Sequence, residues 1–311
     1  TLSSSSAASD VYKRQELESA HAERAARASG GAHPDIVHES AFSRALDRLV
    51  STHLVPSLPR TLSRAEPLPL YALTLVGTAS EICPAVADAL HARGLGAHVP
   101  AAILRYACEG SVQPAMLILL LRLLESPTAN RGELWDGGGL APLFARLLEM
   151  GVPTDPPSGA RRAGGAGDAG GAGGTLAHAS LDVTLDALHT LLAFMADSPG
   201  DSPADAAEGV ARFWARRAAE LLPAAPPLIR LCHAELGLAT KAAHCALLLA
   251  RMCGEGGRAS APADARAAFV EGETGASLRA ALELAPPERA AVSQPLLAVL
   301  RAVLPSAARA C

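Results

Sequence analysis

The most regular hydrophobic pattern in the chain is the stretch PAMLILLLRLLE, residues Pro114–Glu125. Four leucines recur there at helical spacing, and apolar residues also fill most of the other faces; the four are Leu117, Leu120, Leu121 and Leu124. A helix that is apolar almost all round lies inside a protein and is covered on several sides. Pro114 suits the first helical turn and Pro127 follows the last, so we predict a buried helix here with other helices around it.

Helical periodicity recurs along the rest of the chain. The predicted segments are 41–62, 68–81, Pro84–Arg93, Val99–Tyr106, 137–151, 180–196, Phe213–Leu222, Pro227–Leu236, Ala239–Cys253, Leu278–Leu284 and Gln294–Leu304. Half of the residues are hydrophobic, mainly Ala, Leu and Val, and only 3% are aromatic. Because Ala and Leu favour helices and the residues that favour strands are scarce, we predict an all-α fold.

Two segments interrupt this pattern. Residues 1–40 carry no steady apolar period, and their opening SSSSAASDVYKRQ is interpreted as a cloning or transcript-assembly scar. Residues 153–179 form a Gly/Pro-rich insertion that cannot bury enough apolar surface to order itself. We therefore expect disorder in both, and helical repeats over 41–152 and 180–311. Ser180 is expected to cap the helix that follows, with Asp182 and Asp186 near its positive end.

The predicted helices follow a repeating plan, in which a shorter helix with an early proline precedes a longer, nearly all-apolar one. Leu73 and Leu117 lie at equivalent places in two units, and the interval between them falls within the period of about 40–47 residues that is typical of armadillo and HEAT repeats. The next interval, to Leu188, is longer because the insertion lies within it. Repeats of this kind stack into a superhelix. We predict an armadillo/HEAT-like α-solenoid of about five units; a compact helical bundle is the alternative.

Two segments of the sequence resemble a known family: EPLPLYALTLV at 66–76 and LWDGGGLAPLFARLLE at 134–149. They are similar to the armadillo-like C-terminal region of the Fused-type serine/threonine kinases, which include the plant two-in-one and RUNKEL proteins. The resemblance covers roughly Phe42–Ala196; some other armadillo-like protein is the alternative. It implies a scaffold that binds kinesins or other microtubule-associated proteins in microtubule, cilium or cytokinesis-related assembly. No kinase signature is present, so no catalytic residue is transferred from the family.

Charge and composition narrow the function further. A net charge of −4 and a pI near 6.2 argue against a general nucleic-acid binder. Asn130 is the only asparagine, so the asparagine ladder with which importin-type armadillo proteins hold peptides is missing. The uncharged run Pro67–Ser80 is too short to cross a bilayer, and no signal peptide is visible. We expect a cytoplasmic protein, associated through the resemblance with the cytoskeleton or a cilium, whose partners are proteins and not membranes.

Candidate chemistry is sparse. Residues Gly165–Gly170 match G-x-G-x-x-G, but no strand precedes them, so we interpret them as linker. Five cysteine and histidine residues lie within 22 residues of one another: Cys232, His233, His244, Cys245 and Cys253. This group supports the alternative function, an all-α enzyme or ligand-binding protein with a pocket between helices. None of its spacings is that of a structural zinc site. We predict no catalytic, cofactor-binding or metal-binding residue.

The remaining conspicuous side chains admit ordinary interpretations. His33 and His38 lie in the segment predicted to be disordered, and His189 is expected at a packing edge. Trp135 and Trp214 are candidates either for exposed binding anchors or for core packing. For Tyr71, packing between helices is the expected role. The sequence assigns no binding residue and leaves the docking face open.

Overall fold

The computed structural model describes residues 44–126, 131–137, 139–152, 171–197, 213–214, 216–254, 267–283 and 290–303. Within these ranges every regular element is a helix and none is a strand, so the fold is all-α as predicted. The elements are η1 (Val50–Leu54), α3 (Val55–Leu62), α4 (Leu68–Ile82), α5 (Ala85–Ala92), α6 (His98–Glu109), α7 (Pro114–Glu125), α8 (Arg131–Asp136), α9 (Leu140–Gly151), α10 (Gly171–Asp197), η2 (Leu222–Ala224), α12 (Ala225–Leu231), α13 (Leu236–Gly254), α15 (Gly272–Glu283) and α16 (Ala290–Val303).

Helix α7 has the predicted bounds. Pro114 occupies its first turn after the extended Gln113, and Ser126 leaves the helical conformation at its end. Half of its side chains are buried: Met116, Leu117, Leu119, Leu120, Leu123 and Leu124. Each buried leucine contributes about 1.5–3 kcal/mol of transfer free energy, so α7 is a major part of the core.

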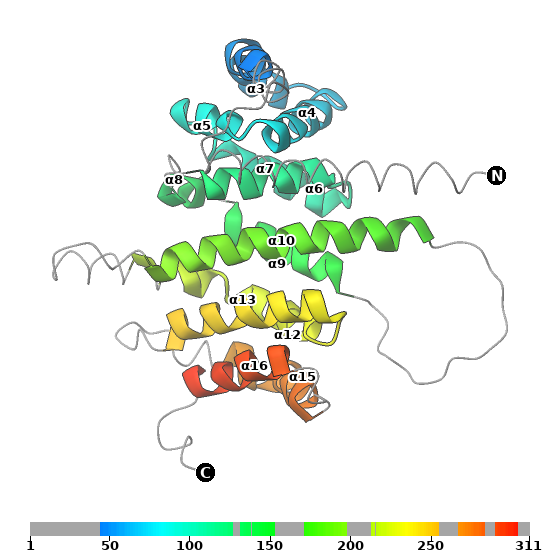
Figure 1. Cartoon of the computed structure of the whole chain (residues 1–311), viewed down its shortest axis with the longest axis vertical. Coiled ribbons are helices and arrows are strands. Elements are labelled where there is room, and N and C mark those ends of the chain that lie inside the picture. The colour runs from blue at the N-terminus through cyan, green and yellow to red at the C-terminus, as the bar shows by residue number, and fades with distance from the viewer. Residues whose placement is uncertain are drawn as a thin grey trace, which may run out of the picture.

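Two series of helices run through the molecule. In the first, which we name the α4–α16 series, α4 packs on α7, α7 on α10, α10 on α13 and α13 on α16. In the second, α6 packs on α9, α9 on α12 and α12 on α15. Figure 1 shows successive pairs lying one below another along the longest axis, from α3 and α4 to α15 and α16. The core therefore extends along the molecule between the two series.

Close helix contact within the α4–α16 series depends on small residues. Gly77 of α4 lies against Ala115 of α7, and a Cβ added at Gly77 would be only 2.6 Å from the Ala115 carbonyl carbon. Leu73, Leu117 and Leu188, which the sequence plan relates, are all fully buried on α4, α7 and α10. Helix α5 ends shortly before Gly94 and α6 just before Gly110, and both glycines adopt the left-handed conformation that ends a helix.

The predicted start of the helix after the insertion is wrong. Helix α10 begins at Gly171, so Ser180 is no N-cap, and its carbonyl accepts a hydrogen bond from Thr184 Oγ1 within the helix. Residues 171–179, expected to be disordered, are therefore helical. Residues 175–179 contain neither Gly nor Pro, and they continue the helix that the buried leucines anchor. The rest of the predicted insertion and residues 1–40 lie outside the described residues.

The first predicted segment, 41–62, is not one regular amphipathic helix. Leu49 is one of its large apolar residues and is 58% exposed. The π-helical turn η1 follows Leu49 and shifts the register of the apolar positions.

Candidate functional site

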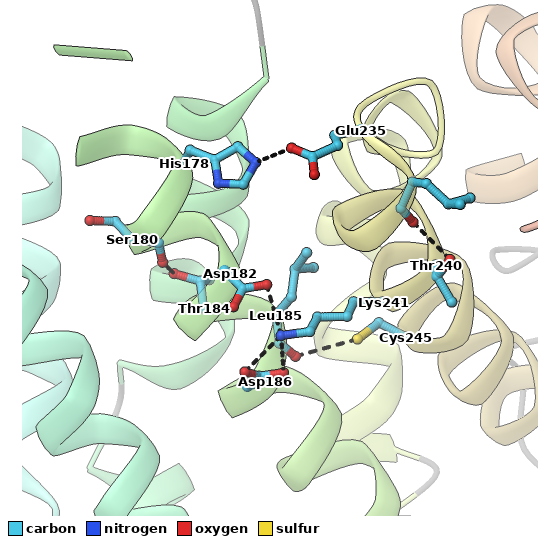
Figure 2. A network of polar contacts seen from close by, with 11 residues as sticks. His178, Ser180, Asp182, Thr184, Leu185, Asp186, Glu235, Thr240, Lys241 and Cys245 are labelled. Carbon is cyan, nitrogen blue, oxygen red and sulfur yellow. Dashed lines mark hydrogen bonds and ion pairs between the residues drawn. The ribbon is translucent and has the colours of Figure 1, made fainter. Parts of the chain in front are cut away.

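Polar side chains join α10 to α13 at two points (Figure 2). Lys241 Nζ on α13 lies 2.7 Å from Oδ1 of Asp182 and 2.7 Å from Oδ1 of Asp186, both on α10. His178 Nε2 lies 3.1 Å from Glu235 Oε2 at the beginning of α13. The Lys241 side chain is 35% exposed, so the bridge lies at the border between the core and solvent.

The charge of Lys241 is fixed by this bridge. Burial lowers the pKa of Lys241, but hydrogen bonds from its ammonium group to Asp182 and Asp186 outweigh burial and leave the pKa raised. The amine therefore stays protonated at neutral pH and cannot act as a nucleophile. The interpretation of the two aspartates as helix-dipole partners is wrong, because α10 begins well before them and both instead bind Lys241.

The cysteines near this bridge are buried and unreactive. Cys245 is fully buried and its Sγ–H donates to the Leu185 carbonyl at 3.6 Å (Figure 2). Burial raises the pKa of the Cys232 thiol to about 12 and that of Cys253 to about 12. Burial likewise raises the pKa of Cys245. Since only the thiolate is a good nucleophile or metal ligand, these thiols behave as small core residues.

The histidines of the same group point elsewhere. His233 and His244 are exposed, while the three cysteines are inside, and His233 Nε2 is paired with the Ser277 carbonyl at 3.1 Å. Among the described residues, no three His, Cys, Asp or Glu side chains are placed to hold a metal ion. The five residues of the group at 232–253 therefore do not converge on one site.

A second polar cluster joins α6 to the start of α4. Tyr106 O–H donates to Glu66 Oε1 at 2.7 Å, and Arg105 Nη2 donates to the same oxygen at 2.6 Å. Burial and the hydrogen bond to Glu66 raise the pKa of Tyr106, so the phenol stays protonated. The cluster links residues that are far apart in the sequence and holds together two consecutive units.

A cavity of about 330 Å³ lies between α3 and α6 beside this cluster. Its walls are mostly apolar, with Leu58, Leu62 and Ala102 among them. The hydroxyl of Ser63 at its edge donates to the Pro59 carbonyl at 2.9 Å, and Arg105 is bound to Glu66. The residues that line the cavity thus include no nucleophile paired with a base. None of them belongs to the cysteine and histidine group at 232–253.

Both tryptophans are core residues. Trp135 is 4% exposed, and its Nε1–H donates to Glu220 Oε2 at 2.8 Å. Trp214 is 7% exposed and makes edge-to-face contacts with Phe194 and Phe213, at ring-centroid distances of 5.6 and 4.9 Å. The alternative in which they are exposed binding anchors is therefore wrong, because their side chains fill space between helices.

Large apolar side chains are instead exposed along α4. Leu68, Tyr71, Leu75 and Ile82 are 54%, 64%, 56% and 51% exposed. They recur at intervals of three, four and seven residues and so form one line on the helix, which we name the α4 stripe. Tyr71 is its most exposed member, which contradicts the expectation that it packs between helices. The sequence of α4 does not show which side of the helix is exposed, because large apolar residues lie on every side.

Other residues singled out in the sequence are exposed or not described. His189 is exposed on α10. His33, His38 and Gly165–Gly170 lie outside the described residues. Two described segments, His178–Ala196 and Leu236–Cys253, are long and apolar enough to cross a membrane, a property that buried core helices share. The apolar part of the first segment is 44% buried inside the structure, and that of the second segment is 56% buried.

Comparisons with known proteins add no relative. No protein-family model matches the chain, and no curated protein or solved structure matches it at a significant level.

Proposed function

We propose that this chain is a non-catalytic protein-protein interaction scaffold built on armadillo-like repeats that form an α-solenoid. The observation that carries the proposal is the serial packing of equivalent helices, α4 on α7, α7 on α10, α10 on α13 and α13 on α16. Units that are apolar on several faces cannot shield themselves, so each covers the next, and their outer sides line up into one extended surface. Surfaces of this kind bind elongated protein partners.

The proposed docking face is the outer side of the α4–α16 series. On α10, His189 lies one turn beyond Asp186 on the same side of the helix, and His244 lies one turn beyond Lys241 on α13. Both histidines are exposed, so they flank the Lys241 bridge on the solvent side. The resemblance to the Fused-type repeat region favours kinesins or other microtubule-associated proteins as partners, and a cytoplasmic location at the cytoskeleton or a cilium.

The buried thiols and the separated histidines give no support to the alternative function, an enzyme or ligand-binding pocket at 232–253. The scaffold proposal is tested by measuring binding of the immobilised chain to purified kinesins and microtubule-associated proteins of the source cell by biolayer interferometry. A double variant, His189→Glu with His244→Glu, adds two negative charges to the proposed face and is expected to weaken binding at least tenfold.

The matched control adds the same two charges to the other series. Ala101→Glu on α6 and Ala276→Glu on α15 are both at exposed positions, so the control variant has the same net charge. The control variant is expected to bind as the wild type does. Equal losses in both variants would refute the assigned face, and a failure of every such protein to bind the wild type would refute the proposed partners.

A further inference from the structure

The α4 stripe has the spacing of a helix-pairing seam. Leu68, Leu75 and Ile82 are seven residues apart, and Tyr71 and Thr78, also exposed, lie between them. This alternation of three and four residues is the a/d pattern by which two helices pack along a common line. Glu81 is the only charged residue of α4. A helix with large apolar residues on every side is normally covered on most of its surface, yet each residue of the stripe is more than half exposed.

The stripe faces away from the rest of the α4–α16 series. Gly77 marks the side of α4 that meets α7, and Leu75, two residues earlier, points in a nearly opposite direction because successive residues turn by about 100°. Tyr71 on α4 and Ala115 on α7 are separated by the same number of residues as Leu73 and Leu117, so they occupy equivalent positions in two units. Since Ala115 is the residue that α7 sets against α4, the α4 stripe is the corresponding face of α4. Helix α3 and the turn η1 also contact α4, but they leave each residue of the stripe more than half exposed.

The other end of the series is different. The exposed side of α16 presents Gln294, Leu297 and Arg301, so a single large apolar side chain lies between two polar ones. An apolar stripe would therefore gain little by packing on the α16 end of another copy. Head-to-tail stacking, which would lead to open filaments, is disfavoured, whereas a self-complementary contact between two identical ends closes on itself.

We propose that two copies of this chain associate head to head through their α4 stripes, as an antiparallel helix pair with the two-fold axis near Leu75. In this arrangement each Leu75 meets its symmetry mate, and Leu68 of one copy meets Ile82 of the other. The Glu81 carboxylates lie toward opposite ends of the pair, so like charges are kept apart. The contact continues the α4–α16 series through the axis into the second copy.

The dimer goes beyond the proposed scaffold function and does not depend on it. One helix from each copy buries a small interface, so a dissociation constant in the micromolar range is expected. A dimer would present two docking faces, and a partner with two binding sites would be held more tightly than by either face alone.

Sedimentation equilibrium of the full chain over a range of concentrations tests the proposal. The wild type is expected to show a monomer–dimer equilibrium, and Leu75→Glu to shift it at least tenfold toward monomer. Leu297→Glu, at a comparably exposed leucine on the opposite end, is the control and is expected to leave the equilibrium unchanged. A wild type that stays monomeric up to millimolar concentration, or a dimer that tolerates Leu75→Glu, would overturn the proposal.

Disulfide trapping gives an answer that does not depend on a destabilising variant. In a background with Cys108→Ser and Cys311→Ser, Leu75→Cys is expected to form a covalent dimer under mild oxidation, and Leu297→Cys to remain monomeric. An equimolar mixture of Leu68→Cys and Ile82→Cys chains is expected to cross-link more than either chain alone, because the pair is antiparallel. Equal trapping at positions 75 and 297 would contradict the assigned face.

Discussion

Replacing Gly77 by alanine tests the packing of α4 on α7 most sharply. Gly77 is buried in the middle of α4 and faces the backbone of Ala115. An added Cβ would lie 2.6 Å from the Ala115 carbonyl carbon and 3.1 Å from the Ala115 Cβ, and it would be still closer to the carbonyl oxygen. These neighbours are backbone atoms or the first side-chain atom, so no rotamer change can make room, and the two helices have to move apart.

The expected cost follows from two opposing effects. Alanine in place of glycine inside a helix stabilises it by about 1 kcal/mol. Overpacking in a core costs about 1–3 kcal/mol and occasionally more, and the rigid backbone contact here places Gly77→Ala at about 3 kcal/mol. The net prediction is a loss of about 2 kcal/mol in the free energy of unfolding.

Urea unfolding followed by far-ultraviolet circular dichroism measures this loss. Gly237→Ala on α13 is the matched control, because no atom lies within 4 Å of a Cβ added there. The control is expected to be as stable as the wild type or more stable by about 0.5 kcal/mol. If Gly77→Ala were as stable as Gly237→Ala, the close contact between α4 and α7 would be refuted.

Three further predictions concern the Lys241 bridge, the hydrogen bond between Trp135 and Glu220, and the buried thiols. Lys241→Met is expected to cost about 1 kcal/mol at pH 8. Because the folded-state pKa of Lys241 is raised above its ordinary 10.5, this stabilisation is complete below about pH 10.5 and is lost as the pH rises through the folded value, so the difference between wild type and variant in urea unfolding should shrink above pH 10.5. Trp135→Phe removes the donor to Glu220 and should cost about 1–2 kcal/mol, measured by urea unfolding through the fluorescence of the remaining tryptophan. The cost should be much smaller when Glu220→Ala has already removed the acceptor. In a Cys311→Ser background, Ellman's reagent at neutral pH should label, among the described cysteines, only the exposed Cys108 in the folded protein, and rapid labelling of Cys232 or Cys245 before unfolding would contradict the assigned burial.

Much of the helical pattern could be predicted from the sequence because apolar periodicity is local. Five apolar residues that recur at helical spacing in α9 are all buried, as are four in α10; they are Leu140, Leu143, Phe144, Leu147, Leu148, Leu181, Leu185, Leu188 and Leu192. Glycine marks the helix end where the backbone adopts the left-handed conformation, as at Gly110 after α6. The start of α10 could not be found in this way, because its first four residues include Gly171, Gly173 and Gly174, and glycine has a low helix propensity.

The candidate site was less predictable because it depends on contacts between distant helices. Asp182 and Asp186 show one-turn spacing in the sequence, but their partner Lys241 lies on another helix far along the chain. Trp135 is equally suited to a core or a surface until Glu220 is placed beside it. The exposure of Tyr71 has no local signal either, since α4 is apolar on every side and only the order of stacking decides which side lacks a neighbour.

The helices of the α4–α16 series are stacked in order. Distances between spin labels measure this most directly, with Thr78→Cys on α4 paired in turn with His189→Cys on α10 and Gln294→Cys on α16, in the Cys108→Ser, Cys311→Ser background and diluted with unlabelled chain. The first pair spans two packing steps and the second pair spans four, and each step adds a similar interaxial distance. Serial stacking therefore predicts a second label distance that is about twice the first. Two similar distances would show helices gathered around one centre and would contradict it.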